Sequence, residues 1–141
     1  MSTEQTTKAS GACLCGSVTY EVSGPLSNVL YCHCAQCRKT SGHYLAATSC
    51  ERDHLKITND EGLRWFRSSD EAKRGFCDRC GSSLFWSFDE APSISIMPGS
   101  LDLPTGLKVD GHIFVADASD YYTIDDGLPQ HADYGTINAA E

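Results

Sequence analysis

The distribution of cysteine is the feature that most restricts what this chain can fold into. Of the eight cysteines in its 141 residues, seven lie in three short clusters. Cysteines this close can turn their sulfurs toward one ion, and C-x₂₋₄-C pairs supply zinc with thiolate ligands two at a time. A disulfide between such near neighbours needs a strained backbone, so the spacing indicates metal binding rather than a disulfide framework. The clusters are Cys13 and Cys15; Cys32, Cys34 and Cys37; and Cys77 and Cys80.

The number of cysteines in each cluster predicts one closed and one open metal site. Two, three and two cysteines make seven ligands, one fewer than two complete tetrahedral sites need. A structural zinc is closed by four protein ligands, whereas a catalytic zinc keeps three and leaves one position to water or substrate. The sequence therefore predicts two zinc ions per chain. The closed site would use Cys13, Cys15, Cys77 and Cys80, and the open site Cys32, Cys34 and Cys37.

Three residues are alternative fourth ligands for the central cluster. His33 stands between two of its cysteines in a stretch expected to be extended, which would turn the histidine side chain away from theirs. His43 follows Cys37 closely and stays open as a ligand. Cys50 follows an apolar run over residues 45–48 that is typical of a buried strand, which favours a core thiol.

Length and composition predict a single small domain. A chain of 141 residues can form one modest hydrophobic core. We expect a flexible tail over residues 1–10, one zinc domain over residues 11–135 and a short tail over residues 136–141. The polar start lacks a signal-peptide pattern, and no apolar run approaches the about 18 residues that span a bilayer. Thiolate-rich sites without a secretion signal predict a cytoplasmic protein with no membrane partner; the oligomeric state stays open.

Charge is divided unevenly along the chain. Residues 1–80 contain ten Lys/Arg and nine Asp/Glu, and residues 81–141 contain one and ten, so the net charge of −8 lies in the C-terminal part. Affinity for nucleic acid depends on cationic groups, and we therefore expect no nucleic-acid partner. Five basic residues lie close to the cysteine clusters, where they could offset thiolate charge or hold an anionic substrate. They are Arg38, Lys39, Lys73, Arg74 and Arg79.

The hydrophobic pattern predicts short strands and little helix. Alternation of apolar and polar residues, punctuated by Gly and Pro turns, is typical of a β-dominated fold. One short helical turn is expected over residues 35–42, ended by Gly42. The expected strands cover residues 17–22, 45–48, 54–58, 63–67, 83–88, 93–97 and 112–116.

Three segments in this order resemble the glutathione-dependent formaldehyde-activating enzyme (GFA) family, which also includes the centromere protein V domain. They are GACLCGSVTY at residues 11–20, CHCAQCRKTSG at residues 32–42 and RGFCDRCGSSLF at residues 74–85. Residues 98–102 and 112–114 resemble the family's later part, so the resemblance covers residues 10–130. It implies an all-β fold, the β-tent, with two zinc ions in the partition given above. It also implies a carbon–sulfur lyase of the S-(hydroxymethyl)glutathione synthase type, which joins glutathione to formaldehyde reversibly.

A thiol substrate also agrees with the predicted ligands of the open site. Three thiolates make a zinc ion electron-rich, which suits it poorly to ionising water and better to a further sulfur ligand. Glutathione carries carboxylates that Arg38 or Lys39 could bind. A group must also move the hydroxyl proton of the thiol–aldehyde adduct, and His43, His112 and Asp102 are candidates. The alternative function is a non-catalytic, zinc-stabilised binding module, whose central cluster would be closed by a protein side chain.

Overall fold

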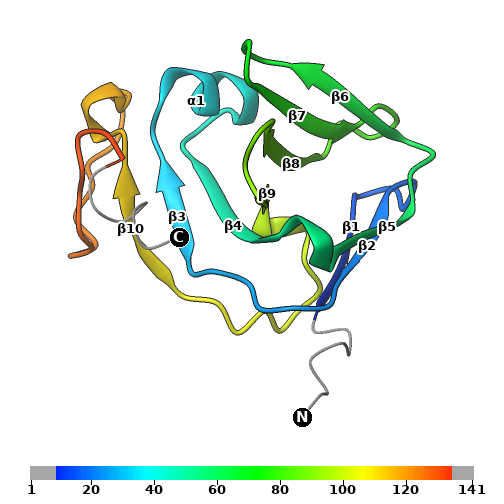
Figure 1. The fold of residues 1–141 in the computed structure, drawn as a ribbon. Coiled ribbons are helices and arrows are strands. Elements are labelled where there is room, and N and C mark those ends of the chain that lie inside the picture. The colour runs from blue at the N-terminus through cyan, green and yellow to red at the C-terminus, as the bar shows by residue number, and fades with distance from the viewer. Residues whose placement is uncertain (1–8, 135–141) are drawn as a thin grey trace. The chain divides into compact units, whose positions relative to one another are not determined.

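A computed structural model describes residues 9–134, which form two compact units. The first unit comprises residues 9–27 and 48–106, and the second comprises residues 28–47 and 107–134. Strands dominate both, as the ribbon in Figure 1 shows, and the predicted β-dominated class is confirmed. No helix within residues 9–134 is long and apolar enough to cross a membrane.

The first unit contains two antiparallel sheets. One has the order β1–β2–β5, formed by Ala9–Ala12, Thr19–Val22 and Leu55–Asn59. In the other, the end of β4 (Leu45–Glu51) pairs with β9 (Ser93–Ile96), followed by β8 (Ser83–Phe88), β7 (Ala72–Cys77) and β6 (Leu63–Arg67). Tyr20 and Phe85, both fully buried, meet edge to face with ring centroids 5.3 Å apart, so β2 and β8 share one core.

The second unit is built on three strands and one helix. Strand β3 (Val29–Cys32) pairs antiparallel with the start of β4 and parallel with β10 (Val109–Ile113). Helix α1 (Ala35–Ser41) follows β3 directly and ends at Gly42, whose φ of 91° is accessible to glycine. The predicted helical turn is therefore confirmed. The β3–β10 pair is parallel; its two strands are far apart in sequence, and no hairpin joins them.

Several strand boundaries also differ from those predicted. Strand β10 begins and ends three residues earlier than expected, because Phe114 has a left-handed backbone (φ 58°) that ends the extended stretch. Strands β1, β3 and β7 were not predicted. Because Ala9 and Ser10 pair with Val22 and Glu21, strand structure begins inside the expected N-terminal tail. The rest of that predicted tail, residues 1–8, and the whole predicted C-terminal tail, residues 136–141, lie outside the described residues.

Three 3₁₀ turns complete the described elements. They are η2 (Arg52–His54), η3 (Pro98–Ser100) and η4 (Val115–Asp117). The last of these turns begins directly after Phe114 and leads into residues 118–134. This segment returns to strand β10, where the His131 N–H donates to the His112 carbonyl and the His112 N–H donates to the Pro129 carbonyl. This returning segment supplies side chains to the site described below.

Candidate metal centres

The four cysteines of the first and last clusters meet in the first unit. Cys13 and Cys15 follow strand β1, while Cys77 ends strand β7 and Cys80 lies in the turn after it. Their sulfur atoms all lie within 4.8 Å of one another. Cys15 Sγ is 3.7 Å from Cys77 Sγ, although 62 residues separate them in sequence. A metal ion at this position would therefore join the beginning of the chain to its middle.

The surroundings of this four-cysteine cluster suit thiolate ligands. The backbone N–H of Arg79 donates to Cys77 Sγ (3.4 Å), and Ser82 Oγ lies 3.2 Å from Cys80 Sγ. The Ser82 hydroxyl lowers the pKa of Cys80 to about 5, whereas burial raises the pKa of Cys77 to about 11. A bound cation would offset that cost of burial for the Cys77 thiolate. Gly62 packs so closely that an added Cβ would lie 2.7 Å from Cys77 Sγ, so glycine leaves room for the sulfur.

The three cysteines of the central cluster meet in the second unit. Cys32 ends strand β3, Cys34 caps helix α1, and Cys37 lies on the buried face of that helix. The backbone N–H of Cys37 donates to Cys34 Sγ (3.3 Å). The three sulfur atoms also lie within 4.8 Å of one another. Contact with Cys34 and Cys37 raises the pKa of Cys32 far above its ordinary value, because three thiols so close cannot all ionise without a cation.

Both clusters fit a metal that prefers sulfur ligands. Four thiolates, or three with an open position, are the ligand sets of structural and catalytic zinc. All eight cysteines are free, so the described structure contains no disulfide framework. Within residues 9–134, neither group of potential ligands includes a histidine, a carboxylate or Cys50. The alternatives that close the central cluster with His33, His43 or Cys50 are therefore not supported by this geometry.

His33 takes part in a different arrangement. Its ring is fully buried and lies between two partners: Nδ1 is 2.5 Å from the Tyr122 hydroxyl, and Nε2 is 2.8 Å from His112 Nδ1. His112 is also buried, and its Nε2 is 2.8 Å from Asp126 Oδ2. We call these four residues, Tyr122, His33, His112 and Asp126, the histidine–tyrosine network.

The surroundings of the network shift the pKa values of three of its members, His33, Tyr122 and Asp126. Burial, followed by the neighbouring His112, lowers the pKa of His33 to about 4, so its ring is neutral. Burial raises the pKa of Tyr122 and outweighs the backbone N–H of Ser119 and the charge of Arg38, which both lower it, so the phenol keeps its proton. A hydrogen bond from the Leu128 backbone and a second from His112 lower the pKa of Asp126, so it stays a carboxylate.

The other predicted site residues have separate positions. His43 is exposed, and its Nδ1 lies 2.5 Å from the Tyr121 hydroxyl. Cys50 is buried in strand β4, where burial raises the pKa of its thiol to about 11, as expected for a core thiol. Asp102 belongs to the first unit and accepts a hydrogen bond from Ser10 Oγ (2.5 Å). It therefore does not belong to the unit that contains the central cluster.

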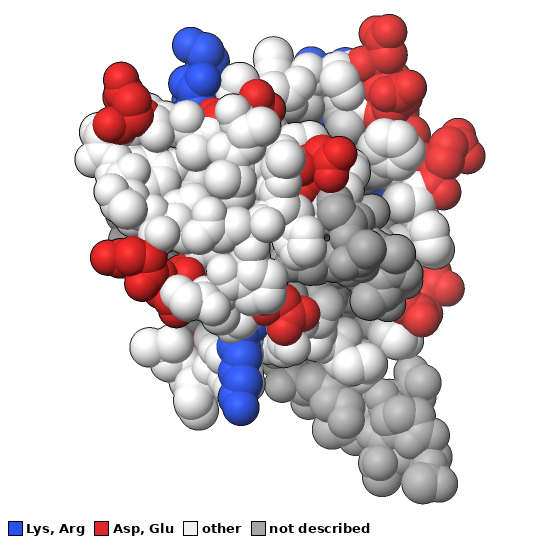
Figure 2. All heavy atoms as spheres, turned by 90° about the vertical axis from the view of Figure 1, so that its left-hand side faces the viewer, with Lys and Arg blue, Asp and Glu red and all other residues white. Residues whose placement is uncertain are grey.

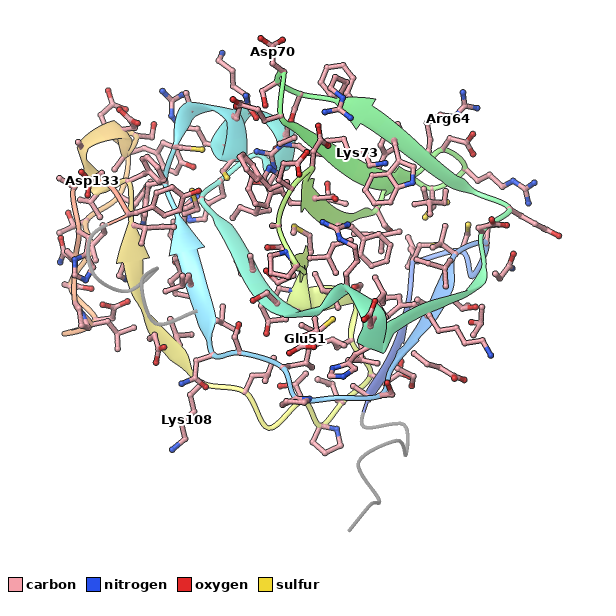
Figure 3. The ribbon with its side chains drawn as sticks, in the orientation of Figure 1. Glu51, Arg64, Asp70, Lys73, Lys108 and Asp133 are labelled. Carbon is pink, nitrogen blue, oxygen red and sulfur yellow. The ribbon has the colours of Figure 1, made fainter. Side chains whose placement is uncertain are left out.

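The basic residues near the clusters have different partners. Arg38 is half-buried and donates from Nε to the Asp117 carbonyl (3.4 Å), while Lys39 on the next position of helix α1 is exposed. In the first unit, Lys73 lies 4.6 Å above the Trp65 ring, and Figure 3 shows it on the β6–β7 hairpin. Arg38 is therefore held by a backbone carbonyl of the second unit, to which the central cluster also belongs.

Acidic side chains are prominent on the face of the molecule drawn in Figure 2. Figure 2 shows the face that includes β10, with acidic side chains at several places and basic side chains only near its edges. Lys108, the single basic residue after residue 81, projects outward at the start of β10 in Figure 3. This face offers little attraction to a polyanion.

Sequence reasoning missed three members of the aromatic and histidine surroundings. Tyr121, Tyr122 and Asp126 lie on the segment that returns after strand β10. Tyr121 is 78 residues from its partner His43, and Tyr122 is 89 residues from its partner His33. Asp126 is 14 residues from His112. Tyrosine and aspartate are common on exposed loops, and no local spacing marks these three. The parallel β3–β10 pairing, which brings the segments together, was also not predicted.

Comparison with known proteins identifies the family. Residues 8–117 match the sequence profile described as glutathione-dependent formaldehyde-activating enzyme. This match covers most of the chain and all seven clustered cysteines. The chain therefore belongs to the GFA family, as its three cysteine segments predicted.

Two individual proteins resemble parts of this chain. An uncharacterized lyase of Schizosaccharomyces pombe is 28% identical over 78 residues, which are 55% of this chain and 56% of that protein. The match thus spans about half the length of that relative. A crystal structure of a Rhodobacter sphaeroides protein, a structural genomics target, has a TM-score of 0.59 at 22% identity and covers 71% of this chain and 97% of that one. This second likeness concerns the fold alone.

Proposed function

We propose that this protein is a zinc-dependent carbon–sulfur lyase of the GFA type, which makes or cleaves adducts between a thiol and a small aldehyde. The observation that carries the proposal is the difference between the two cysteine clusters. One has four sulfur atoms in mutual contact range, and the other has three with no fourth candidate ligand within residues 9–134. Family membership and the name of the yeast relative support the same reaction class.

The proposal assigns different roles to the two clusters. Cys13, Cys15, Cys77 and Cys80 would hold a structural zinc, and Cys32, Cys34 and Cys37 a catalytic one. The catalytic zinc would supply a cationic centre that favours the thiolate form of a substrate thiol, the nucleophilic form. In the synthetic direction the sulfur bonds to the aldehyde carbon, the carbonyl becomes a hydroxyl, and one proton must reach the oxygen. Cleavage reverses each change.

Glutathione is the proposed thiol and formaldehyde the proposed aldehyde. The family's description supports both, and the half-buried Arg38 beside Cys37 offers a cation for a glutathione carboxylate. Eight free cysteines and two candidate thiolate metal sites suit a reducing compartment, and we propose a cytoplasmic location on that ground.

Metal content and thiol-dependent aldehyde consumption, measured on one preparation, test the proposed function. We expect close to two zinc ions per chain and formaldehyde consumption that requires glutathione, because the ligand count provides one closed and one open site. Elemental analysis and an aldehyde assay give the two numbers. Full metal loading without any thiol-dependent reaction would instead favour a zinc-stabilised binding module, and one tightly held metal would contradict the two-site assignment.

Substitution of Arg38 tests the proposed position of the substrate. We expect Arg38→Ala to weaken glutathione binding by about 1.5–3 kcal/mol, the range for a hydrogen bond to a charged group. Titration calorimetry with glutathione measures the effect, and a small neutral thiol should bind the variant nearly as well as the original protein. The matched control is Lys39→Ala, one position along helix α1 and exposed. An equal loss from both substitutions would indicate general charge attraction and contradict a specific contact at Arg38.

A further inference from the structure

Solvent reaches the four-cysteine cluster of the first unit from one side. Cys13 and Cys77 are 5% and 0% exposed, whereas Cys15 is an exposed residue and Cys80 is half-buried. Leu14, the neighbour of Cys15, is 87% exposed, so the chain around this cysteine lies at the surface. A small molecule from solution therefore meets the sulfur of Cys15 first.

Two polar side chains lie beside this exposed sulfur. Ser17 Oγ is 3.3 Å from Cys15 Sγ, and Arg79 Nη1 donates to the same Ser17 oxygen at 3.3 Å. Arg79 Nη1 also donates to Glu61 Oε1 at 3.4 Å, which holds the guanidinium from a second side. Both hydrogen bonds that the Arg79 side chain makes within residues 9–134 use Nη1, so its Nε and Nη2 donors remain for a ligand.

The bond from Arg79 determines what the Ser17 hydroxyl can do. A guanidinium has donors only, so the Ser17 oxygen accepts from Arg79 and keeps its own proton to donate. A cysteine sulfur bound to a metal cation is a thiolate without further ionisation. In metal-loaded protein Cys15 is thus an exposed nucleophile with a hydroxyl donor and a guanidinium next to it.

We propose that Cys15, Ser17 and Arg79 form a site of reaction with hydroperoxides, which goes beyond the proposed lyase function and does not depend on it. When a thiolate attacks one oxygen of a hydroperoxide, the O–O bond breaks and the other oxygen leaves with the electron pair. The Ser17 hydroxyl and the N–H groups of Arg79 are donors that stabilise the negative charge on that leaving oxygen. An alkylating reagent presents no such oxygen, so these two donors favour hydroperoxides over other electrophiles.

The reaction with hydrogen peroxide balances in two steps. The Cys15 thiolate takes one oxygen and becomes a sulfenic acid, while the other oxygen leaves as hydroxide. The thiolate of Cys77, whose sulfur is 3.7 Å from that of Cys15, then attacks the oxidised sulfur, forms an S–S bond and displaces a second hydroxide. Two electrons pass in all from the two sulfurs to the peroxide, and solvent protons convert both hydroxides to water.

The geometry favours Cys77 as the partner in the second step. Cys13 Sγ is about as near, at 3.8 Å, but a disulfide between two cysteines one residue apart needs a strained backbone. A Cys15–Cys77 bond instead joins the two segments, 62 residues apart, that the metal would join. Because two of four ligands are then lost, oxidation releases the metal while the two segments stay connected.

Zinc release and disulfide mapping on the zinc-loaded full chain test this site. A stoichiometric amount of hydrogen peroxide should release zinc to a chromogenic chelator, and mass spectrometry should find the Cys15 peptide joined to the Cys77 peptide. A dithiol reductant should restore both thiols. Oxidation of any cysteine of the central cluster before Cys15 would overturn the inference, and a link from Cys15 to Cys13 or Cys80 would overturn its second step.

Substitution of Arg79 separates reaction with peroxide from simple exposure of the sulfur. Arg79→Met should slow the peroxide reaction about tenfold or more, the effect of one lost hydrogen bond to a developing charge, and should leave alkylation of Cys15 by iodoacetamide nearly unchanged. Arg67→Met is the matched control, because Arg67 is 50% exposed beside 55% for Arg79 and is likewise paired with a carboxylate. It should react with peroxide as the original protein does.

Ser17→Ala removes the second donor and gives an independent measure. It should also slow the peroxide reaction while zinc content before oxidation stays at the level of the original protein. Equal peroxide rates in the original protein, Arg79→Met and Ser17→Ala would overturn the site, and so would an equal slowing of peroxide and iodoacetamide. None of these readouts is lyase activity, so a protein that cleaves no thiol–aldehyde adduct would contradict the proposed function and leave this inference standing.

Discussion

Replacement of Cys77 by serine is expected to unfold the first unit. Cys77 is fully buried and brings the end of strand β7 to the Cys13–Cys15 segment, 62 residues away from Cys15. Structural zinc contributes roughly 10–16 kcal/mol to folding in small zinc peptides, and a whole domain is stable by only about 5–15 kcal/mol. Loss of one of four thiolates therefore removes a stabilisation comparable to the entire free energy of unfolding. Circular dichroism melts and zinc analysis of the variant measure the effect.

Cys50 provides the matched control for this experiment. It is also a buried thiol of the first unit, but it lies outside both clusters. Cys50→Ser should keep two zinc ions and lose about 1–3 kcal/mol, the cost of a buried hydroxyl without a good partner. If both variants melt together with full zinc content, the four-cysteine cluster does not hold the unit and the structural assignment is wrong.

Several strands could be predicted because alternation of apolar and polar residues is visible within a few consecutive positions. The division of the cysteines between two sites could be predicted from their number in each cluster. Strands β6 and β8 alternate apolar and polar residues clearly, and the structure places them at the predicted bounds. Clusters of two, three and two cysteines favoured one site with four ligands and one with three, and the sulfur atoms form these two groups in the structure. Gly42 likewise marked the end of helix α1, since its positive φ favours glycine.

The missed elements depend on tertiary contacts. Strand β3 carries Cys32, and its four residues are too few to show a period. Strand β7 includes Lys73, Arg74 and Gly75, which obscure the alternation of apolar and polar residues. Gly75 leaves room for the Trp65 ring, which packs against the backbone there. The histidine–tyrosine network requires the parallel pairing of β3 and β10, which single-sequence patterns do not encode. His112 could be suspected from sequence, but its partners could not.

The central cluster should behave in the opposite way to the four-cysteine cluster when one of its ligands is changed. Cys37→Ser is expected to remove the proposed catalytic zinc and to lower thiol-dependent aldehyde activity by at least about 100-fold. A metal ion supplies several kcal/mol of charge stabilisation, and each 1.36 kcal/mol corresponds to about tenfold in rate. The fold should survive, because Cys37 lies on a helix of seven residues and the strands of the second unit pair without it.

Three measurements on Cys37→Ser decide between a catalytic and a structural role for the central cluster. Zinc analysis should give about one ion per chain in place of two, the melting temperature should fall by only a few degrees, and aldehyde consumption should be lost. Cys50→Ser, measured in parallel, should retain activity because the thiol lies outside the cluster. A Cys37→Ser protein that keeps full activity would exclude the central cluster from the reaction. One that unfolds like Cys77→Ser would mean that both clusters are structural, because a site needed only for chemistry contributes little to the free energy of unfolding.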